Sequence, residues 1–303
     1  MGQIGLIGGL PYLKSMILIN LLATIGLVLF FYYLLKKFQI TRHPLILATV
    51  LLFLPRFLVV RTVGAPESLF MLLTLLSLFF FEKERFWLAG LFGGLATMTK
   101  TPGILLFPAY MFVLIESYVI PAPACNAMRS IAGRKAGIQP KIFNFKWLYL
   151  FLIPFGLLVV FGIYAIQYKD FFAYFHSGDN IHLVFPYSVF NFQKPWVGTA
   201  WLEEIVFYYF MYGLALVNLK DTKYRSFFYF GLVFFTATLF VQHRDISRYS
   251  LPLWPLALIA FEKFFTSKKF LIIFVILLPA IFLFAFNFLN YNVMPISDWS
   301  AFL

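Results

Sequence analysis

Ionisable side chains stand at the ends of apolar segments in this sequence. Glu67 follows a Gly-Ala-Pro break and precedes the apolar run 69–81, and Arg61 lies just before that break. Lys100 ends another apolar run, within Thr99-Lys100-Thr101-Pro102-Gly103. A carboxylate in such a position can accept a proton from a hydroxyl group, and ammonium or guanidinium groups can bind phosphate oxygens. These residues could therefore act on a hydroxyl group and a phosphate-bearing molecule.

The densest group of polar side chains is His243-Arg244-Asp245-Ile246-Ser247-Arg248-Tyr249, which precedes an apolar run with two prolines. An aromatic and basic anchor at a membrane interface would explain Arg248 and Tyr249, but not so many ionisable groups in one short turn. Guanidinium groups bind phosphate oxygens through paired hydrogen bonds. We therefore predict that Arg244, Asp245, Arg248 and Tyr249 bind substrate.

Several of these groups also have a plain structural explanation. An acid in the first turn of a helix, such as Glu67, is favoured by the open N–H groups and the helix dipole. A lysine at the end of a membrane span, such as Lys100, often extends toward the interface. His176 lies in a polar and aromatic segment with other His and Asp residues, but the sequence has no HExxH or comparable metal signature. We predict that His176 contacts substrate and that no metal is bound.

The elements that must hold these side chains are strongly apolar. Of the 303 residues, 62% are hydrophobic and 12% are charged, whereas soluble domains are about one quarter charged. Apolar runs recur along the whole length, and many approach the roughly 20 residues that cross a bilayer. The sequence therefore predicts an all-α integral membrane protein with one polytopic domain over residues 1–303.

We expect about ten transmembrane helices, because the apolar runs are separated by short polar or basic segments. The expected spans are 16–35, 44–60, 68–81, 87–98, 104–119, 147–168, 201–219, 226–242, 251–264 and 270–289. Cytoplasmic loops collect Lys and Arg. Placing 36–43 in the cytoplasm also places there the loops 82–86, 120–146, 220–225 and 265–269, which are all rich in Lys or Arg.

This topology places the N-terminus and the candidate site residues on the external side of the membrane. Arg61, Glu67, Lys100, the loop 169–200 and the turn 243–250 all lie there, so the positive-inside rule does not explain their charges. The net charge of +12 is explained by the basic loops between spans, so membrane lipids are the expected partners and nucleic acid is not. Cys125 is the single cysteine, which excludes an intrachain disulfide.

The motifs, taken in order, resemble those of polytopic glycosyltransferases of the GT-C class, which use polyprenyl-phosphate sugars. They are PRFLVVRTVGAPESLF, FEKERFWLAGLFGGLATMTKTPGILLFP, DFFAYFHSGDN and RYSLPLWPLAL. The sequence is most similar to the branch that holds GPI mannosyltransferase 2-like proteins and the prokaryotic family 39 and RgtA/B/C/D-like transferases. In these families a Glu-Ser pair opens a span, a Gly-rich stretch with a basic end follows, and an Arg-Tyr pair with prolines comes late.

The resemblance implies a GT-C-like fold and a transferase in the cell (cytoplasmic) membrane. Such an enzyme moves a mannose-like hexose or a pentose from a polyprenyl-phosphate donor to a lipid, glycan or protein acceptor on the external face. It implies no cofactor besides this donor substrate. Glu67 is then the candidate catalytic carboxylate. The other expected roles are lipid-phosphate binding by Lys100, Arg244 and Arg248, and a site wall formed by Arg61 and His176.

The sequence departs from the family at its beginning. The key acid of these families, usually an Asp in the first external loop, has no counterpart, because the first residues resemble the approach to the family's second helix. Two other functions stay open. Charges at span ends and Gly/Pro breaks also suit a lipid-linked sugar carrier or transporter, and a non-catalytic membrane protein that binds a partner protein is the third interpretation.

Overall fold

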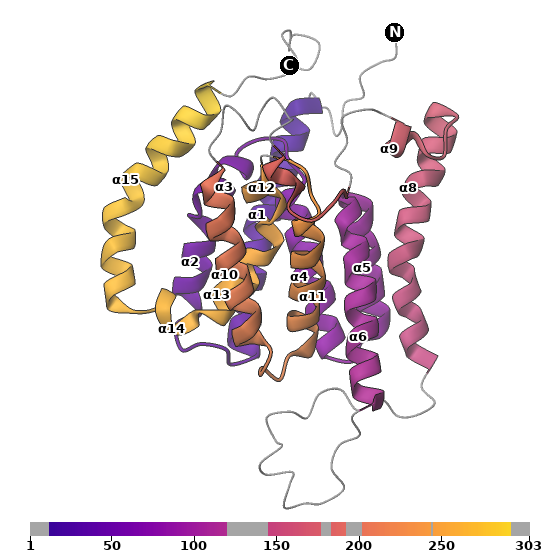
Figure 1. The fold of residues 1–303 in the computed structure, drawn as a ribbon, viewed down its shortest axis with the longest axis horizontal. Coiled ribbons are helices and arrows are strands. Elements are labelled where there is room, and N and C mark those ends of the chain that lie inside the picture. Colours follow the sequence, from indigo (N-terminus) through magenta and orange to yellow (C-terminus); the bar gives the residue numbers. More distant parts are fainter. Residues whose placement is uncertain (1–11, 120–144, 177–182, 192–201, 244, 292–303) are drawn as a thin grey trace, which may run out of the picture. The chain divides into compact units, whose positions relative to one another are not determined.

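Helices occupy the segments that the sequence predicts as apolar spans (Figure 1). The structure is a computed structural model, and it describes residues 12–119, 145–176, 183–191, 202–243 and 245–291. These residues form α-helices and 3-10 helices and no strand. The described part of the protein is therefore all-α, as predicted. The basic loop predicted over 120–146 lies, up to residue 144, outside the described residues.

The chain divides into two units, and the first consists of Met1–Leu72 and Phe261–Leu303. In this unit α1 packs along α2, α15 packs against α3, and α14 contacts α2. Its helices are α1 (Tyr12–Lys37), α2 (Pro44–Leu52), α3 (Pro55–Val60), the start of α4 (Glu67–Glu82), α14 (Glu262–Phe265) and α15 (Lys268–Tyr291).

The second unit consists of Leu73–Ala260. Here α5 lies along α8, α6 packs on α11, and α10 contacts both α11 and α13 (Figure 1). Besides the rest of α4, its α-helices are α5 (Phe86–Thr99), α6 (Leu106–Val119), α8 (Leu152–Tyr168), α9 (Ala173–His176), α10 (Glu203–Leu219), α11 (Arg225–Leu239), α12 (Ile246–Tyr249) and α13 (Trp254–Ala260). Its 3-10 helices are η1 (Thr101–Leu105), η2 (Phe145–Phe151), η3 (Ser188–Phe190) and η4 (Leu251–Leu253).

Three helical segments of the described chain are long and apolar enough to cross a membrane. They are Lys14–Lys37, Phe145–Tyr168 and Lys268–Tyr291. Four further apolar helices are shorter, Phe86–Thr99, Thr101–Ser117, Arg225–Leu239 and Leu251–Ala260. The length and composition of these helices indicate a membrane protein, whereas the number of ten crossings stays a prediction.

The segment 44–60 forms two helices where the sequence predicted one span. Helix α2 ends at Leu52 and α3 begins at Pro55. Proline has no N–H to donate to the preceding turn and its ring disfavours helical backbone in the residue before it. Leu54 accordingly adopts φ −58° and ψ 130°. The break leads into the turn that carries Arg61.

Close backbone contact joins α5 to α8. A Cβ atom on Gly156 would lie 2.5 Å from the carbonyl oxygen of Gly94, and a Cβ on Gly94 would lie 2.6 Å from the carbonyl oxygen of Leu152. Small residues allow membrane helices to approach in this way, because no side chain separates the two backbones. The glycine-rich stretch of α5 is therefore a packing surface, and Lys100 follows directly at the end of this helix.

We predict that Gly156→Val destabilises the protein, because the new side chain would collide with the backbone of α5. Overpacking of this kind costs about 1–3 kcal/mol, and it should lower the midpoint of thermal unfolding of the purified protein in detergent. Gly162→Val on the same helix is the matched control, since a Cβ at Gly162 meets no atom within 4 Å. Equal midpoints for the two variants would contradict the close packing of α5 and α8.

Candidate functional site

The first group of polar side chains surrounds the start of α4 and is here named the Glu67 cluster. It consists of Asn20 and Thr24 on α1 and of Glu67 and Ser68 on α4. All four side chains are buried, with Glu67 only 1% exposed. Because polar groups inside an apolar helical protein are costly to bury, their concentration at one place indicates either a site or a structural joint.

Hydrogen bonds from α1 fix the turn that precedes Glu67. The Asn20 side-chain amide donates to the carbonyl oxygens of Val60, at 2.9 Å, and Val63, at 2.6 Å. The Thr24 hydroxyl oxygen lies 2.8 Å from the carbonyl oxygen of Asn20 and 2.8 Å from the hydroxyl oxygen of Ser68. The polar face of α1 therefore holds both sides of the Gly-Ala-Pro break in place.

Glu67 is the first residue of α4. The N–H groups of a first helical turn have no partner within the helix, and the positive end of the helix dipole stabilises a carboxylate there. This local arrangement offsets part of the cost of burying a charge in an apolar protein. Glu67 therefore occupies a position where an ionised carboxylate is favoured, which a proton acceptor requires.

We predict that Asn20→Leu loosens the turn at residues 60–66, because two buried carbonyl oxygens lose their donor. Each buried polar group left without a partner costs about 1–3 kcal/mol. Hydrogen exchange of the turn should accelerate, and the thermal midpoint should fall. Asn218→Leu is the control, since Asn218 is exposed on α10. Unchanged exchange in Asn20→Leu would show that α1 does not hold this turn.

Arg61 ends α3, and its guanidinium carbon lies 5.4 Å from the ring centroid of Phe53. A guanidinium over an aromatic face is attracted by the negative charge density of the ring. The neighbouring Arg56 is placed similarly, 4.2 Å from the ring centroid of Phe288 on α15. Arg61 is thus positioned by an aromatic ring within the first unit, and its predicted role as part of the site wall stays a prediction.

The second group of polar side chains lies in the second unit and is here named the Lys100 cluster. It consists of Lys100, His243, Asp245, Arg248 and Tyr249. The Lys100 ammonium nitrogen lies 5.1 Å from the centroid of the Tyr249 ring, and the His243 ring packs edge-to-face on Tyr249 at 5.0 Å. The backbone N–H of Asp245 donates to His243 Nδ1 at 2.9 Å. The fold therefore unites two turns that are distant in the sequence.

The turn after α5 positions Lys100. The backbone of Lys100 is extended, with φ −154° and ψ 126°, so α5 ends here and η1 begins at Thr101. The backbone N–H of Gly103 donates to the carbonyl oxygen of Lys100 at 2.9 Å. Gly103 lies so close to the last turn of α5 that a Cβ on it would collide with the backbone of Thr97. Glycine is therefore needed at this position for the tight turn that presents Lys100.

Tyr249 and Arg248 lie on α12, which is anchored from below and above in the sequence. Asp245 precedes this short helix, and its carbonyl oxygen accepts the backbone N–H groups of Arg248, at 3.0 Å, and Tyr249, at 3.1 Å. The buried Tyr212 hydroxyl of α10 lies 3.1 Å from the hydroxyl oxygen of Ser250. Arg248 is half-buried. The helix thus carries a guanidinium and a phenol on a fixed backbone.

The two ammonium and guanidinium groups of the Lys100 cluster suit an anionic ligand. Lysine acts on phosphate as a point charge, and arginine can bind two oxygens at once. A tyrosine ring beneath Lys100 holds the ammonium by a cation–π interaction of about 0.5–2 kcal/mol, which leaves the three N–H donors directed away from the ring. The cluster can therefore bind a phosphate group and stabilise negative charge that develops on it.

His176 is placed apart from these contacts. Its Nδ1 lies 2.7 Å from Asp170 Oδ2, which is its partner among the described residues. The hydrogen bond with His176 lowers the pKa of the Asp170 carboxyl. Both side chains lie in the segment after α8, next to the aromatic rings of Phe161, Phe172 and Phe175. The predicted contact of His176 with substrate stays a prediction, and Arg244 lies outside the described residues.

Some residues of these clusters do not stand out in the sequence. Asn20 and Thr24 lie inside a continuous apolar run, but their i, i+4 spacing on α1 places both on one face of the helix. This spacing of two polar residues within a membrane span is the signal that could have found them. Tyr212 gave no such signal, because the sequence is rich in tyrosine and phenylalanine.

Comparison with known families gives one match. Residues 4–116 match the model of Glycosyltransferase family 87. No curated protein and no solved structure matches the chain. The matched segment contains the whole Glu67 cluster together with Arg61 and Lys100, whereas the turn 243–249 lies beyond it. The narrower resemblance to GPI mannosyltransferase 2-like and family 39 proteins stays a prediction. Over its first 116 residues the chain is thus similar to glycosyltransferase family 87, and this similarity, with the apolar helices, supports a membrane glycosyltransferase.

Proposed function

We propose that the protein transfers a sugar from a polyprenyl-phosphate donor to a hydroxyl group of a lipid, glycan or protein acceptor. The donor sugar would be a mannose-like hexose or a pentose, and the reaction would take place at the external face of the cell membrane. The observation that carries this proposal is the position of the Lys100 ammonium 5.1 Å from the Tyr249 ring centroid, which brings the two basic turns of the second unit together.

In this reaction the acceptor oxygen bonds to the anomeric carbon of the sugar, and the bond from that carbon to the phosphate oxygen breaks. The acceptor hydroxyl gives up its proton, and polyprenyl phosphate leaves with an additional negative charge. Lys100 and Arg248, with Arg244, would stabilise this charge. Glu67 would take the proton or support the group that takes it.

The remaining predicted residues would bind the sugar and complete the site. Tyr249 offers an aromatic face and a hydroxyl group, and Asp245 offers hydrogen-bond acceptors, for which the ring hydroxyls of a sugar are suitable donors. Arg61 and His176 would form the site wall. The basic end of α1, with Lys36 and Lys37, would face the cytoplasm, because cytoplasmic ends of membrane helices collect Lys and Arg.

The test is an assay of the purified full chain in liposomes with a radiolabelled polyprenyl-phosphate hexose and a mixture of lipid and glycan acceptors. We expect label to pass to an acceptor, with release of polyprenyl phosphate. Arg248→Gln should lower this rate about 100-fold or more. Arg85→Gln, which removes an exposed arginine at the start of α5, should leave the rate unchanged.

Three results would count against the proposal. Full activity of Arg248→Gln would remove this residue from phosphate binding. Equal losses in Arg248→Gln and Arg85→Gln would indicate an unspecific effect of charge. Movement of the labelled donor across the bilayer without transfer of its sugar would instead favour a lipid-linked sugar carrier.

A further inference from the structure

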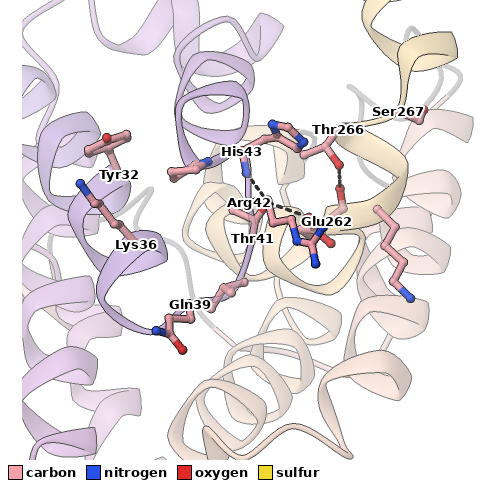
Figure 2. Close-up of a pocket in the computed structure, with 12 residues that line it drawn as sticks. Tyr32, Lys36, Gln39, Thr41, Arg42, His43, Glu262, Thr266 and Ser267 are labelled. Atoms are coloured by element: carbon pink, nitrogen blue, oxygen red, sulfur yellow. Dashed lines mark hydrogen bonds between the residues drawn. The ribbon is translucent and has the colours of Figure 1, made fainter.

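A second polar region of the first unit lies at the C-terminal end of α1. It is an open cavity of about 960 Å³ between the end of α1, the loop that leads to α2, and α14 with the residues that follow it. Figure 2 shows Lys36 and Gln39 on one side of this cavity and Glu262 and Thr266 on the other. None of the residues proposed above for glycosyl transfer lines it.

Cationic side chains outnumber acidic ones in the lining. Lys36, Arg42 and Lys263 face a single carboxylate, Glu262. The Glu262 Oε1 atom accepts a hydrogen bond from the Thr41 hydroxyl at 2.6 Å. Among the described residues, none of the three cations forms an ion pair. The cavity therefore carries a positive charge that the described part of the protein does not neutralise.

Neutral groups of the lining also favour an anion. The loop holds its shape because the backbone N–H of His43 donates to the Thr41 hydroxyl oxygen at 3.0 Å. Helix α2 begins at Pro44, next to His43, and α15 begins just after Ser267. Positive ends of two helix dipoles thus lie at the lining. Tyr32, Thr266 and Ser267 add hydroxyl groups, which can donate to phosphate oxygens.

The cavity lies at the opposite end of α1 from the Glu67 cluster. Sixteen residues separate Asn20 from Lys36, which corresponds to about 24 Å at 1.5 Å per helical residue. Since α1 is long and apolar enough to cross a membrane, its two ends lie near opposite membrane surfaces. The cavity is therefore at the surface away from Glu67, where the positive-inside rule places the cytoplasm.

We propose that this cavity is a binding site for a phosphoryl anion, carried either by the headgroup of an anionic membrane lipid or by a soluble phosphate. Basic pockets between helices at the cytoplasmic surface are suited to anionic headgroups, because cations there lie at the depth of the lipid phosphates. The mouth of the cavity is open and its charge faces outward, so a headgroup can enter without a change in the fold. The site is independent of the proposed transferase activity.

The experiment uses the purified full chain in a neutral detergent and two probes, a fluorescent phosphatidylglycerol and inorganic phosphate. Lipid binding is followed by fluorescence, and phosphate binding is followed by the midpoint of thermal unfolding. The test variant is the pair Lys36→Gln and Arg42→Gln, which removes two charges from the lining. The matched control is the pair Lys37→Gln and Lys269→Gln, which removes two exposed charges nearby that do not line the cavity.

We expect saturable binding of one probe, weakened about fivefold for each cation removed from the lining, and little weakening in the control pair. Lipid binding that excess phosphate does not displace would assign the site to a headgroup. A phosphate-dependent rise of the unfolding midpoint without saturable lipid binding would assign it to a soluble phosphate. Equal weakening in both pairs, or no saturable binding of either probe, would overturn the proposal.

Discussion

Replacing Lys100 with Met should lower sugar transfer about 100- to 1,000-fold, because loss of one group that stabilises developing charge typically has an effect of this size. Methionine keeps the length and apolar contacts of the lysine stem, so the turn after α5 should persist. The change removes only the ammonium group above Tyr249. The measurement is the rate of label transfer from polyprenyl-phosphate hexose in liposomes, at saturating donor and at low donor, with the amount of inserted protein determined in parallel.

Lys223 provides an unusually close control for this prediction. Its ammonium nitrogen lies 5.0 Å from the ring centroid of Tyr224, so Lys223→Met removes a lysine from above a tyrosine at another turn of the same unit. We expect Lys223→Met to retain transfer. If both variants lose activity equally, the lysine–tyrosine contact only supports the fold. If Lys100→Met transfers sugar at the normal rate, Lys100 has no role in binding the lipid phosphate.

The second large effect is expected at Glu67. Glu67→Gln keeps the shape of a side chain that is 1% exposed and removes its ability to take a proton. Loss of a general base lowers rates about 100- to 10,000-fold, and we expect a decrease within this range. Because glutamine can still accept hydrogen bonds at the start of α4, the thermal midpoint should change little. The same liposome assay measures the rate, and unfolding in detergent measures the midpoint.

Glu203→Gln is the matched control, because Glu203 is also the first residue of an apolar helix but is exposed. It should transfer sugar normally. A Glu67→Gln variant with a normal rate would restrict Glu67 to a structural role at the helix start. A lowered midpoint together with a proportional loss of rate would lead to the same conclusion.

Much of the fold follows from the distribution of apolar residues, but the interruptions of helices do not. The long spans at α1 and α15 were predicted nearly to their ends, since hydrophobicity alone determines them. The break at Pro55 divides 44–60, and a second break at Phe261 separates α13 from α14. Apolar residues continue through both breaks, so hydrophobicity does not reveal them. Proline chemistry indicates the first, whereas no single residue type indicates the second.

The candidate site was predictable in its residue types and not in its contacts. Lys100 and Tyr249 were both selected as charged or aromatic groups at span ends, yet their contact depends on the turn at Gly103 and on the anchoring of Ser250 by Tyr212. His176 was selected by the same criteria and instead pairs with Asp170, only six residues away. A sequence shows which groups carry charge, whereas long-range packing decides which of them meet.

The short helices of the second unit have a consequence for the surrounding lipid. Helix α5 has 14 residues and is about 21 Å long at 1.5 Å per residue, whereas the hydrocarbon core of a bilayer is about 30 Å thick. A bilayer adapts to a short apolar segment by becoming locally thinner, at a modest cost in free energy. Lipid headgroups near the end of α5 would then sink toward Lys100, so membrane thickness itself would help to deliver a phosphate to this residue.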